Sequence, residues 1–256
     1  MKQRIFITGA SSGIGEALAV YYAGKGAVLG LAARRADALT ALNERLGGGH
    51  ACYPLDVTDA AALHDAAQDF IARFGVPEIV LASAGVSAGT LTEHAEDLAA
   101  FRRLMDINVY GMAATFAPFI PAMKAAGGFR RLVGLASVAG IRGLPGAEAY
   151  SASKAATIAY LESLRLEMRA CGIKVVTIAP GYIETPMTAV NPYRMPFLLP
   201  AEEAARRFAA AIETGNSYTV IPWQMGVLAK LLRVLPNAVY DRLFAGAPRK
   251  PRGLLK

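Results

Sequence analysis

The first 24 residues hold the pattern that most restricts the folds open to this chain. Residues 4–8 form a short apolar run typical of a β-strand, and the glycine-rich segment 9–15 leads directly into an amphipathic stretch, residues 16–24. A strand, a glycine-rich turn and a helix in this order bring backbone N–H groups and a helix N-terminus to one place, where they can bind a pyrophosphate. The spacing is G-x-x-x-G-x-G rather than the more general G-x-G-x-x-G. We therefore expect a nucleotide-binding fold.

Strand-like and helical segments alternate along the rest of the chain. Further strands are expected at residues 28–33, 50–57, 78–83, 131–137 and 173–179, and a last short one at 218–221. Because helical stretches separate them, the pattern predicts an α/β fold with a doubly wound parallel sheet in a single domain. We expect that domain to cover residues 1–246, without an internal linker or repeat. The basic segment 247–256 is expected to be a mobile tail.

Two arginines follow the second expected strand. Dinucleotide folds that bind NAD commonly place an acid near the end of this strand for the ribose 2′-hydroxyl, whereas a basic residue there accommodates a 2′-phosphate. Ala33, Arg34 and Arg35 occupy this position, and none of them is an acid. The sequence therefore favours NADP(H) and leaves NAD(H) as a second cofactor. The alternative is that both arginines are merely solvated at the start of a helix.

Two isolated polar residues stand out further along the chain. Asp56 ends the third expected strand, where its carboxylate could accept a hydrogen bond from an adenine amino group or cap the next helix. Asn108 lies in an otherwise apolar helical stretch, residues 101–126. A buried amide is unfavourable unless its hydrogen bonds are satisfied, which marks Asn108 for a structural or a catalytic role.

Tyr150 and Lys154 are four residues apart in a stretch, residues 150–170, that has the apolar spacing of a helix. They therefore lie on one side of that helix. A free phenol has a pKa near ~10, and a nearby ammonium favours the phenolate and lowers that pKa. Ser137 ends the fifth expected strand, where its hydroxyl could hold a carbonyl oxygen. Taken alone, Tyr-x-x-x-Lys is a short pattern that also occurs on ordinary helices.

Together these motifs resemble the short-chain dehydrogenase/reductase family. The resemblance covers residues 1 to about 190 and rests on the order and spacing of the segment Thr8 to Gly15, Asn108, Ser137, Tyr150 with Lys154, and Pro180-Gly181. It implies a Rossmann-type fold that binds NAD(P), with hydride transfer between the nicotinamide and a substrate carbon. One difference from the family pattern is Ala82-Ser83-Ala84-Gly85, where the family usually has Asn-Asn-Ala-Gly.

The resemblance also implies roles for individual residues. Tyr150 would be the general acid/base, Ser137 would orient the substrate oxygen, and Lys154 would bind the nicotinamide ribose and depress the pKa of the tyrosine. Asn108 would hold a water that links Lys154 to solvent. The cofactor contacts that it implies are Gly9, Ser11, Ser12, Gly13, Ile14, Gly15, Arg34, Arg35, Asp56, Val57, Ala84, Gly85, Tyr150, Lys154, Pro180, Gly181, Ile183 and Thr185. The predicted function is an NADP(H)-dependent oxidoreductase that interconverts a ketone or aldehyde and an alcohol. The alternative is an NADP-binding regulatory or scaffold protein without turnover, which would not need the tyrosine.

A mostly apolar segment, residues 186–200, is expected to form the lid of the substrate pocket. Its adaptable methionines and aromatic residues favour a bulky or lipophilic ketone or secondary alcohol. The alternative is that these residues belong to the core or to a subunit contact. In the resembling family the helices corresponding to 101–126 and 150–170 often pack against their copies, so a homodimer or homotetramer is expected.

Charge is concentrated at the C-terminal end. From Pro222 onward seven lysines and arginines oppose one aspartate, which accounts for +6 of the formal net charge of +7. The rest of the chain is nearly neutral, so we expect no nucleic-acid partner. The segment from Trp223 to Arg233 could form an amphipathic helix on a membrane or another subunit, although core packing is the commoner explanation. Two cysteines and three scattered histidines form no disulfide framework or metal site, and with no signal peptide they favour a reduced, cytoplasmic setting.

Overall fold

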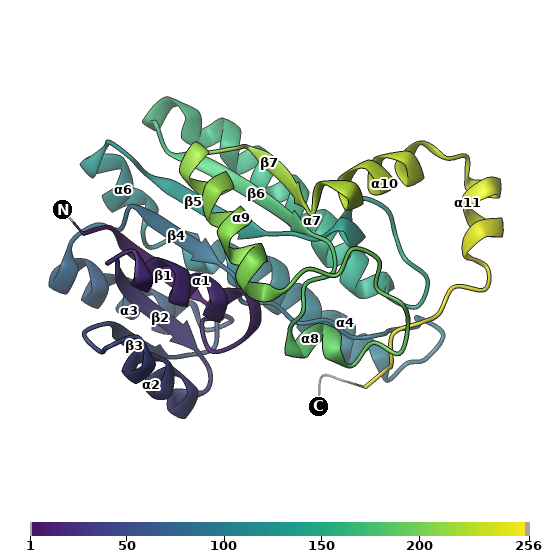
Figure 1. Cartoon of the computed structure of the whole chain (residues 1–256), viewed down its shortest axis with the longest axis horizontal. Helices are drawn as coiled ribbons and strands as arrows, with labels where there is room; N and C mark the ends of the chain where they lie inside the picture. The colour runs from purple at the N-terminus through teal and green to yellow at the C-terminus, as the bar shows by residue number, and fades with distance from the viewer. Residues whose placement is uncertain (1, 254–256) are drawn as a thin grey trace.

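A parallel sheet of seven strands forms the centre of the computed structural model, which describes residues 2–253 (Figure 1). The strand order is β3-β2-β1-β4-β5-β6-β7, so the chain winds outward in both directions from β1 and β4. The strands are β1 (Arg4–Thr8), β2 (Val28–Ala33), β3 (Ala51–Pro54), β4 (Ile79–Ala82), β5 (Arg131–Leu135), β6 (Lys174–Pro180) and β7 (Tyr218–Ile221). This order confirms the predicted doubly wound α/β fold, and the last short strand joins the same sheet.

Helices cover both faces of the sheet (Figure 1). The α-helices are α1 (Gly13–Gly24), α2 (Ala36–Arg45), α3 (Ala60–Phe74), α4 (Asp97–Met105), α5 (Gly111–Phe116), α6 (Ile120–Ala126), α7 (Glu148–Met168), α8 (Pro186–Ala189), α9 (Ala201–Thr214), α10 (Trp223–Val234) and α11 (Asn237–Phe244). Three short segments have other helical geometry: the π-helix η1 (Asp106–Tyr110) and the 3-10 helices η2 (Val138–Gly140) and η3 (Arg169–Cys171). Within residues 2–253, no helix is both long and apolar enough to cross a membrane.

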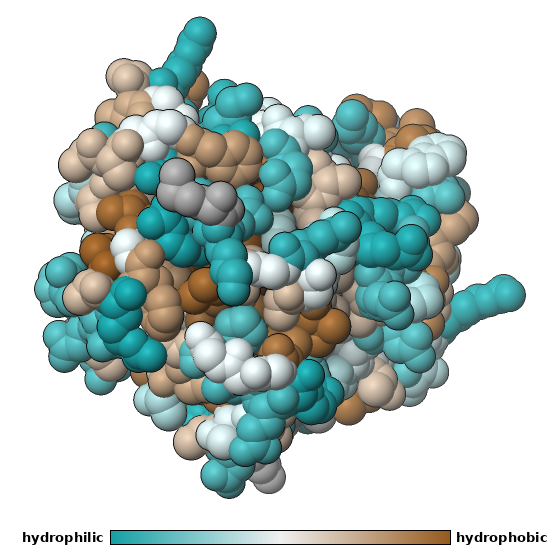
Figure 2. Space-filling model, turned by 60° about the vertical axis from the view of Figure 1, so that its left-hand side comes forward, coloured by the Kyte–Doolittle hydropathy of each residue, from teal (hydrophilic) through white to brown (hydrophobic). Residues whose placement is uncertain are grey.

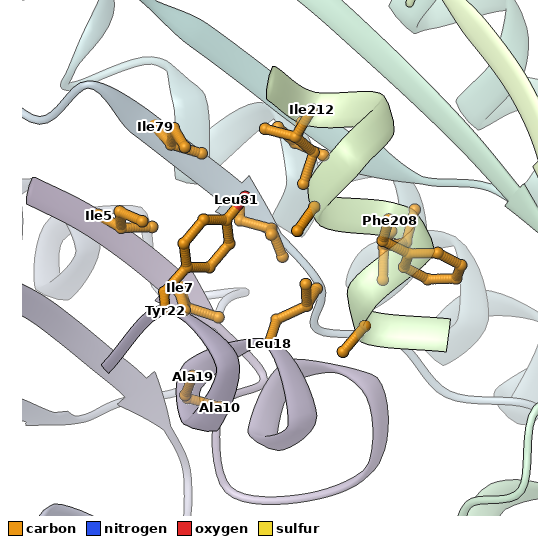
Figure 3. Packing of buried hydrophobic residues seen from close by; sticks show 14 of the residues in the cluster. Ile5, Ile7, Ala10, Leu18, Ala19, Tyr22, Ile79, Leu81, Phe208 and Ile212 are labelled. Carbon is orange, nitrogen blue, oxygen red and sulfur yellow. The ribbon is translucent and has the colours of Figure 1, made fainter. Parts of the chain in front are cut away.

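Two apolar cores form because side chains alternate between the faces of each buried strand. In β1, Ile5 and Ile7 pack toward α1 and α9, whereas Phe6 packs toward α3. Figure 3 shows the first of these cores, where Tyr22 and Phe208 meet the sheet from two helices. A strand that is buried on both faces reads as a continuous apolar run, and this is why the sequence alone placed β1 correctly.

The stretch 101–126 is not one long helix, contrary to the expectation from its composition. A π-helix interrupts it at residues 106–110, and α5 and α6 are separate. Pro118 and Pro121 lack the N–H that a continuous helix needs, which explains the break between α5 and α6. Single-turn π-helices commonly mark functional sites, and this one contains Asn108.

Hydrophilic and hydrophobic residues are mixed on the face of the molecule drawn in Figure 2. Figure 2 brings the left-hand side of Figure 1 forward and shows hydrophobic residues only in small, separate patches. Exposed apolar side chains of this kind are normal on a soluble surface and need no partner. The C-terminal helices differ in this respect, as described below.

Candidate active site

A cavity of about 700 Å³ opens at the carboxyl ends of the central strands. It lies where β1 and β4 are neighbours and the chain leaves them in opposite directions, which is the usual position of ligand sites in doubly wound sheets. The predicted cofactor contacts that line it are Gly9, Ser11, Ser12, Gly13, Ile14, Arg34, Arg35, Asp56, Val57, Ala84, Gly85 and Thr185. The structure therefore brings twelve residues from five separate segments to one cavity.

The glycine-rich turn forms the floor of this cavity. Gly9 has φ of 68°, and a Cβ placed there would lie 2.7 Å from the backbone nitrogen of Ala84. A Cβ at Gly15 would collide with the carbonyl oxygen of Gly9. Ser12 precedes α1 without capping it through its side chain, so the first backbone N–H groups of α1 remain directed at the cavity. This cradle, with a helix N-terminus behind it, fits a dinucleotide pyrophosphate.

Cations gather at the end of β2. Arg35 donates hydrogen bonds from Nη2 to the carbonyl oxygen of Ser11, at 3.0 Å, and to Ser11 Oγ, at 3.2 Å. Arg34 is exposed beside it, and both arginines line the cavity. The arrangement provides two guanidinium groups and a hydroxyl where the adenosine ribose of a dinucleotide would lie.

Asp56 does not cap the next helix, so the capping alternative is wrong. Asp59 does so instead, because its side chain accepts from the backbone N–H of Ala62. Asp56 accepts from the backbone N–H and hydroxyl of Thr58 and from Arg103 Nη2, at 2.8 Å. Burial favours the neutral acid, but these partners outweigh it and hold the pKa of Asp56 below its ordinary value. Its carboxylate is therefore charged and fixed beside Val57 at the cavity wall.

Ser137 and Tyr150 come together at the carboxyl end of β5. Ser137 precedes η2, and its Oγ accepts from the backbone N–H of Ala139 at 3.2 Å. Tyr150 lies in the first turn of α7 and is partly exposed as a residue. Burial of its hydroxyl raises the pKa of Tyr150, while the Ser137 hydroxyl opposes part of that rise. The two hydroxyls therefore lie close to one another.

Lys154 is buried next to Tyr150 and differs from expectation in one respect. Its Nζ donates to the carbonyl oxygen of Leu135 at 2.8 Å and lies 5.9 Å from the centroid of the Tyr150 ring. Burial lowers the pKa of Lys154 to about 8. Burial of the phenol dominates and raises the pKa of Tyr150, which is opposite to the net lowering expected from the sequence, and the effect of the Lys154 ammonium on that pKa stays a prediction. Leu135 lines the cavity, whereas Ser137, Tyr150 and Lys154 are not among its lining residues.

Asn108 is fully buried in η1, and its side-chain amide is completely engaged by protein. Nδ2 donates to the carbonyl oxygen of Val86 and to Ser153 Oγ, both at 3.0 Å, and Oδ1 accepts from the Val86 N–H at 2.9 Å. These bonds tie the segment after β4 to α7, the helix of Tyr150. The structure therefore gives Asn108 a positioning role. The same hydrogen bonds satisfy the side-chain amide, whose burial would otherwise be unfavourable.

Ser83 stands where the resembling family usually has asparagine. Its Oγ lies 3.1 Å from the position that a Cβ of Gly15 would take, so it contacts the glycine-rich turn. Thr8 links β1 to the same segment, since its hydroxyl accepts from the Ala84 N–H at 3.5 Å. The turn and the end of β4 are thus joined by hydroxyl groups.

Pro180, Gly181 and Ile183 lie behind the cavity wall rather than on it. Gly181 donates from its backbone N–H to Ile221, and Ile183 is buried. These residues set the path of the chain into α8, where Thr185 contacts the position of a Gly13 Cβ at 3.3 Å. Nine further residues line the cavity that the sequence did not predict, and most of them flank predicted residues. They are Glu16, Ala33, Leu55, Ser83, Val86, Ile107, Leu135, Pro186 and Met187.

The C-terminal segment docks beside the site. Lys250 Nζ donates to Ser87 Oγ at 2.9 Å and to the carbonyl oxygen of Met187 at 3.3 Å. The Gly89 N–H donates to Pro251, and Arg252 forms ion pairs with Glu96 and Asp97. The expectation of a mobile tail does not account for these contacts, of which all but the one to Met187 join residues more than 150 positions apart. Residues 254–256 of that predicted tail lie outside the described residues.

Comparisons with known proteins agree with this geometry. The sequence profile described as short chain dehydrogenase matches residues 3–194. An uncharacterized oxidoreductase of Myxococcus xanthus is 38% identical over 240 residues, which cover 92% of this chain and 93% of the relative. A 2-dehydro-3-deoxy-L-rhamnonate dehydrogenase (NAD(+)) of a Sphingomonas species is 35% identical over 181 residues, covering 71% and 72%. A solved short-chain dehydrogenase from Streptomyces avermitilis has a TM-score of 0.81 at 24% identity, covering 96% of this chain and 99% of that one.

Proposed function

The chain belongs to the short-chain dehydrogenase family of oxidoreductases, and from this premise we propose that it is an NADP(H)-dependent enzyme that interconverts a ketone or aldehyde and an alcohol. One observation carries the proposal. Lys154 donates to the carbonyl oxygen of Leu135, a residue of the cavity wall, and stands beside Tyr150, whose pKa is influenced by the nearby Ser137 hydroxyl. A protein that only binds a nucleotide has no need of this buried acid/base group.

The chain's own residues supply the proton and the orientation. A nicotinamide held in the cavity would supply or accept the hydride at the substrate carbon. In reduction, the Tyr150 hydroxyl gives its proton to the carbonyl oxygen as charge develops there, and the Ser137 hydroxyl holds that oxygen in position. In oxidation, the same phenolate accepts the alcohol proton, and the cation of Lys154 stabilises that phenolate.

Preference for NADP(H) is the finer part of the proposal. Arg34 and Arg35 with Ser11 provide the charge-assisted contacts that a 2′-phosphate would use, each contributing about 1.5–3 kcal/mol. The name of the Sphingomonas relative specifies NAD(+), so family membership alone does not decide the cofactor. Replacing Arg35 by Ala should raise KM for NADPH by at least about tenfold while leaving KM for NADH nearly unchanged. Equal effects on both cofactors would contradict the preference.

An apolar carbonyl compound is the proposed substrate class. Within the predicted lid, residues 186–200, the large apolar side chains of Met187, Val190, Phe197 and Leu198 are exposed. Such a surface can cover a bulky ligand and gains stability by doing so. A panel of aromatic, aliphatic and steroid-like ketones, compared with small polar sugars, ranks the candidates. Faster turnover of the sugars would contradict this class.

Homo-oligomerisation through α4 and α7 is also proposed. These two helices contact one another and expose Leu98 and Leu166. Sedimentation velocity of the purified chain should give a dimer or tetramer, and Leu166→Glu should reduce that mass. A wild-type chain that sediments as a monomer would exclude the proposal.

The experiment that tests the function is a comparison of wild type with Tyr150→Phe. We expect oxidation of NADPH, followed by the loss of reduced-nicotinamide absorbance, to fall by about 100-fold or more in the variant, because general acid/base catalysis contributes that much. NADPH binding, followed by quenching of protein fluorescence, should not change. Tight NADPH binding without turnover of any carbonyl compound would instead favour a regulatory or scaffold protein.

A further inference from the structure

The C-terminal helix α10 carries large apolar side chains on the side that faces solvent. Trp223, Val227, Leu231 and Val234 are 67%, 50%, 58% and 77% exposed. Their spacing of i, i+4, i+8 and i+11 places them in one stripe along the helix. Most solvent-facing stripes in globular proteins are polar, so this outer stripe requires a partner.

The inner side of α10 is already occupied by the protein itself. Met225, Gly226 and Ala229 are buried, and α10 packs against β7 and η2. A Cβ at Gly226 would lie 3.0 Å from Val220 Cβ, which shows how closely the helix approaches the sheet. The outer stripe is therefore not a core face that has been left open, and the helix cannot bury it by rotating.

Arg142 fixes the C-terminal end of α10 in place. It donates hydrogen bonds to the carbonyl oxygens of Leu232 and Leu235, the latter at 2.8 Å, and its guanidinium lies 3.9 Å from the centroid of the Tyr240 ring. Tyr240 in turn donates from its hydroxyl to Gly143 at 2.6 Å. Helices α10 and α11 thus form a fixed projection, visible beyond the end of the sheet in Figure 1. On α11, Val239 and Leu243 are exposed one helical turn apart.

The charges around the stripe have one predominant sign. From Trp223 to Phe244 the chain contains Lys230, Arg233 and Arg242, all exposed, against the single acid Asp241. The sequence of α10 itself contains no acid. A symmetric contact between two copies of α10 would bring these cations together without an acid on either helix, which disfavours a second copy as the partner.

We propose that the outer face of α10 and α11 docks on the surface of an anionic lipid bilayer. Apolar side chains enter the boundary of the acyl region, and flanking lysines and arginines reach the anionic headgroups. Trp223, at the start of α10, belongs to a residue type that prefers such boundaries. The inference does not depend on turnover. If the substrate is lipophilic, as proposed above, it partitions into the bilayer, and the docked protein binds it there.

The test uses the full chain and vesicles of phosphatidylcholine containing about one third phosphatidylglycerol. The protein should sediment with these vesicles and much less with phosphatidylcholine alone. Trp223 is the only tryptophan in the chain, so a shift of tryptophan emission to shorter wavelength on vesicle addition reports on this site. Absence of both sedimentation and shift would overturn the proposal.

Matched variants locate the contact. Val227 and Val20 are 50% and 49% exposed, each on the outer side of a helix, but Val20 belongs to α1. Val227→Glu should lower vesicle affinity by about tenfold or more, and Val20→Glu should leave it unchanged. Val234→Glu, at an even more exposed position, repeats the test if Val227→Glu folds poorly. Equal losses in Val20→Glu and Val227→Glu would overturn the site.

Electrostatic variants separate lipid from a second copy. Lys230→Gln with Arg233→Gln should weaken binding about fivefold for each cation removed, because each contributes roughly 1 kcal/mol near an anionic surface. Sedimentation velocity without lipid should give the same mass for wild type and Val227→Glu. A wild-type oligomer that dissociates on Val227→Glu, with no vesicle binding, would assign the face to another copy of the chain.

Discussion

The glycine-rich turn near the N-terminus lines the cavity and the docked segment near the C-terminus contacts Met187 of its wall, but different forces hold them. The turn, residues 9–15, is held by backbone packing in which a single added methyl group would collide with the chain. The segment 249–252 is held by the side chains of Lys250 and Arg252 and by a backbone pairing with Gly89. Packed backbone has no room to adjust, whereas surface ion pairs form and break readily. We expect the turn to be essential and rigid, and the segment to be dispensable and adjustable.

Gly15→Ala should produce the largest effect, because it would distort the rigid glycine-rich turn. The new Cβ would collide with the Gly9 carbonyl, so the turn must shift away from the position that the cradle requires. We expect NADPH affinity to fall by about 100-fold and stability to fall by about 1–3 kcal/mol. Calorimetric titration and urea unfolding measure the two effects.

Gly24→Ala is the matched control for that change. Gly24 ends the same helix, and nothing lies within 4 Å of the Cβ that it would gain. Alanine there should leave NADPH affinity unchanged and stability equal or slightly higher. If both substitutions reduced NADPH affinity alike, close packing at Gly15 would not be the reason for its glycine.

Lys154, near the turn's cavity, and Lys250, in the C-terminal segment, should both make the stability of the protein depend on pH. Burial lowers the pKa of both Lys154 and Lys250 to about 8. In the unfolded chain each keeps its proton up to the ordinary value of about 10.5, so between pH 8 and 10.5 the unfolded state binds more protons. Stability should therefore rise with pH across that window, and Lys154, which is more deeply buried, should contribute most of the rise.

Lys154→Met should increase stability at neutral pH while abolishing turnover. The lowered pKa of Lys154 corresponds to about 3 kcal/mol of unfavourable burial, which the substitution removes. The substitution also removes the hydrogen bond to Leu135, which costs about 1 kcal/mol. A net gain of about 1–2 kcal/mol is expected, with a weaker dependence on pH above 8. Lys250→Met is the comparison variant and should change the pH dependence less. Urea unfolding at several pH values decides the matter, and an unchanged pH profile in Lys154→Met would refute the assignment.

The sequence predicted the sheet and the turn well because both depend on local patterns. Strands buried on both faces read as apolar runs, and the turn needs glycine where φ is positive or where the backbone is crowded, as at Gly9 and Gly15. Twelve of the expected cofactor contacts line one cavity for the same reason, since the segments that contain them follow the carboxyl ends of strands. Local patterns also placed Tyr150 and Lys154 on one helix.

Features that depend on distant contacts were not predictable in this way. The π-helix at 106–110 and the three hydrogen bonds of Asn108 depend on Val86 and Ser153, which the helical pattern of residues 101–126 does not contain. Asp59, rather than Asp56, caps α3, and the Asp56 carboxylate instead binds Thr58 and Arg103, the latter 47 residues away. The raised pKa of Tyr150 follows from burial, which a sequence spacing of four does not report.

Arg142→Met tests whether the C-terminal helices are a separate unit of stability. Removing the guanidinium leaves the last carbonyl oxygens of α10 without their donor and should destabilise residues 223–244 by about 1–3 kcal/mol. Hydrogen exchange should become faster in α10 and α11 and remain slow in β1 and α1. Arg242→Met, an exposed arginine on α11, is the control and should change neither. Faster exchange throughout the sheet would show that α10 is part of the central core.

The smallest effect is expected for Arg252→Ala, which should release the C-terminal segment without unfolding the protein. Arg252 donates to Asp97 at 2.7 Å and to Glu96 at 2.9 Å. The bond from Arg252 lowers the pKa of Asp97, and the pKa of Glu96 is lowered first by a hydrogen bond from its own backbone N–H and then by Arg252. The carboxylates therefore stay charged at neutral pH, and the segment should dissociate only as the pH falls below about 4. In the variant, trypsin should cleave after Arg249 about tenfold faster, with no change in melting temperature. Arg252→Lys, which can still pair with Asp97, should restore most of the protection, and protection that survives Arg252→Ala would mean that Gly89 and Lys250 alone hold the segment.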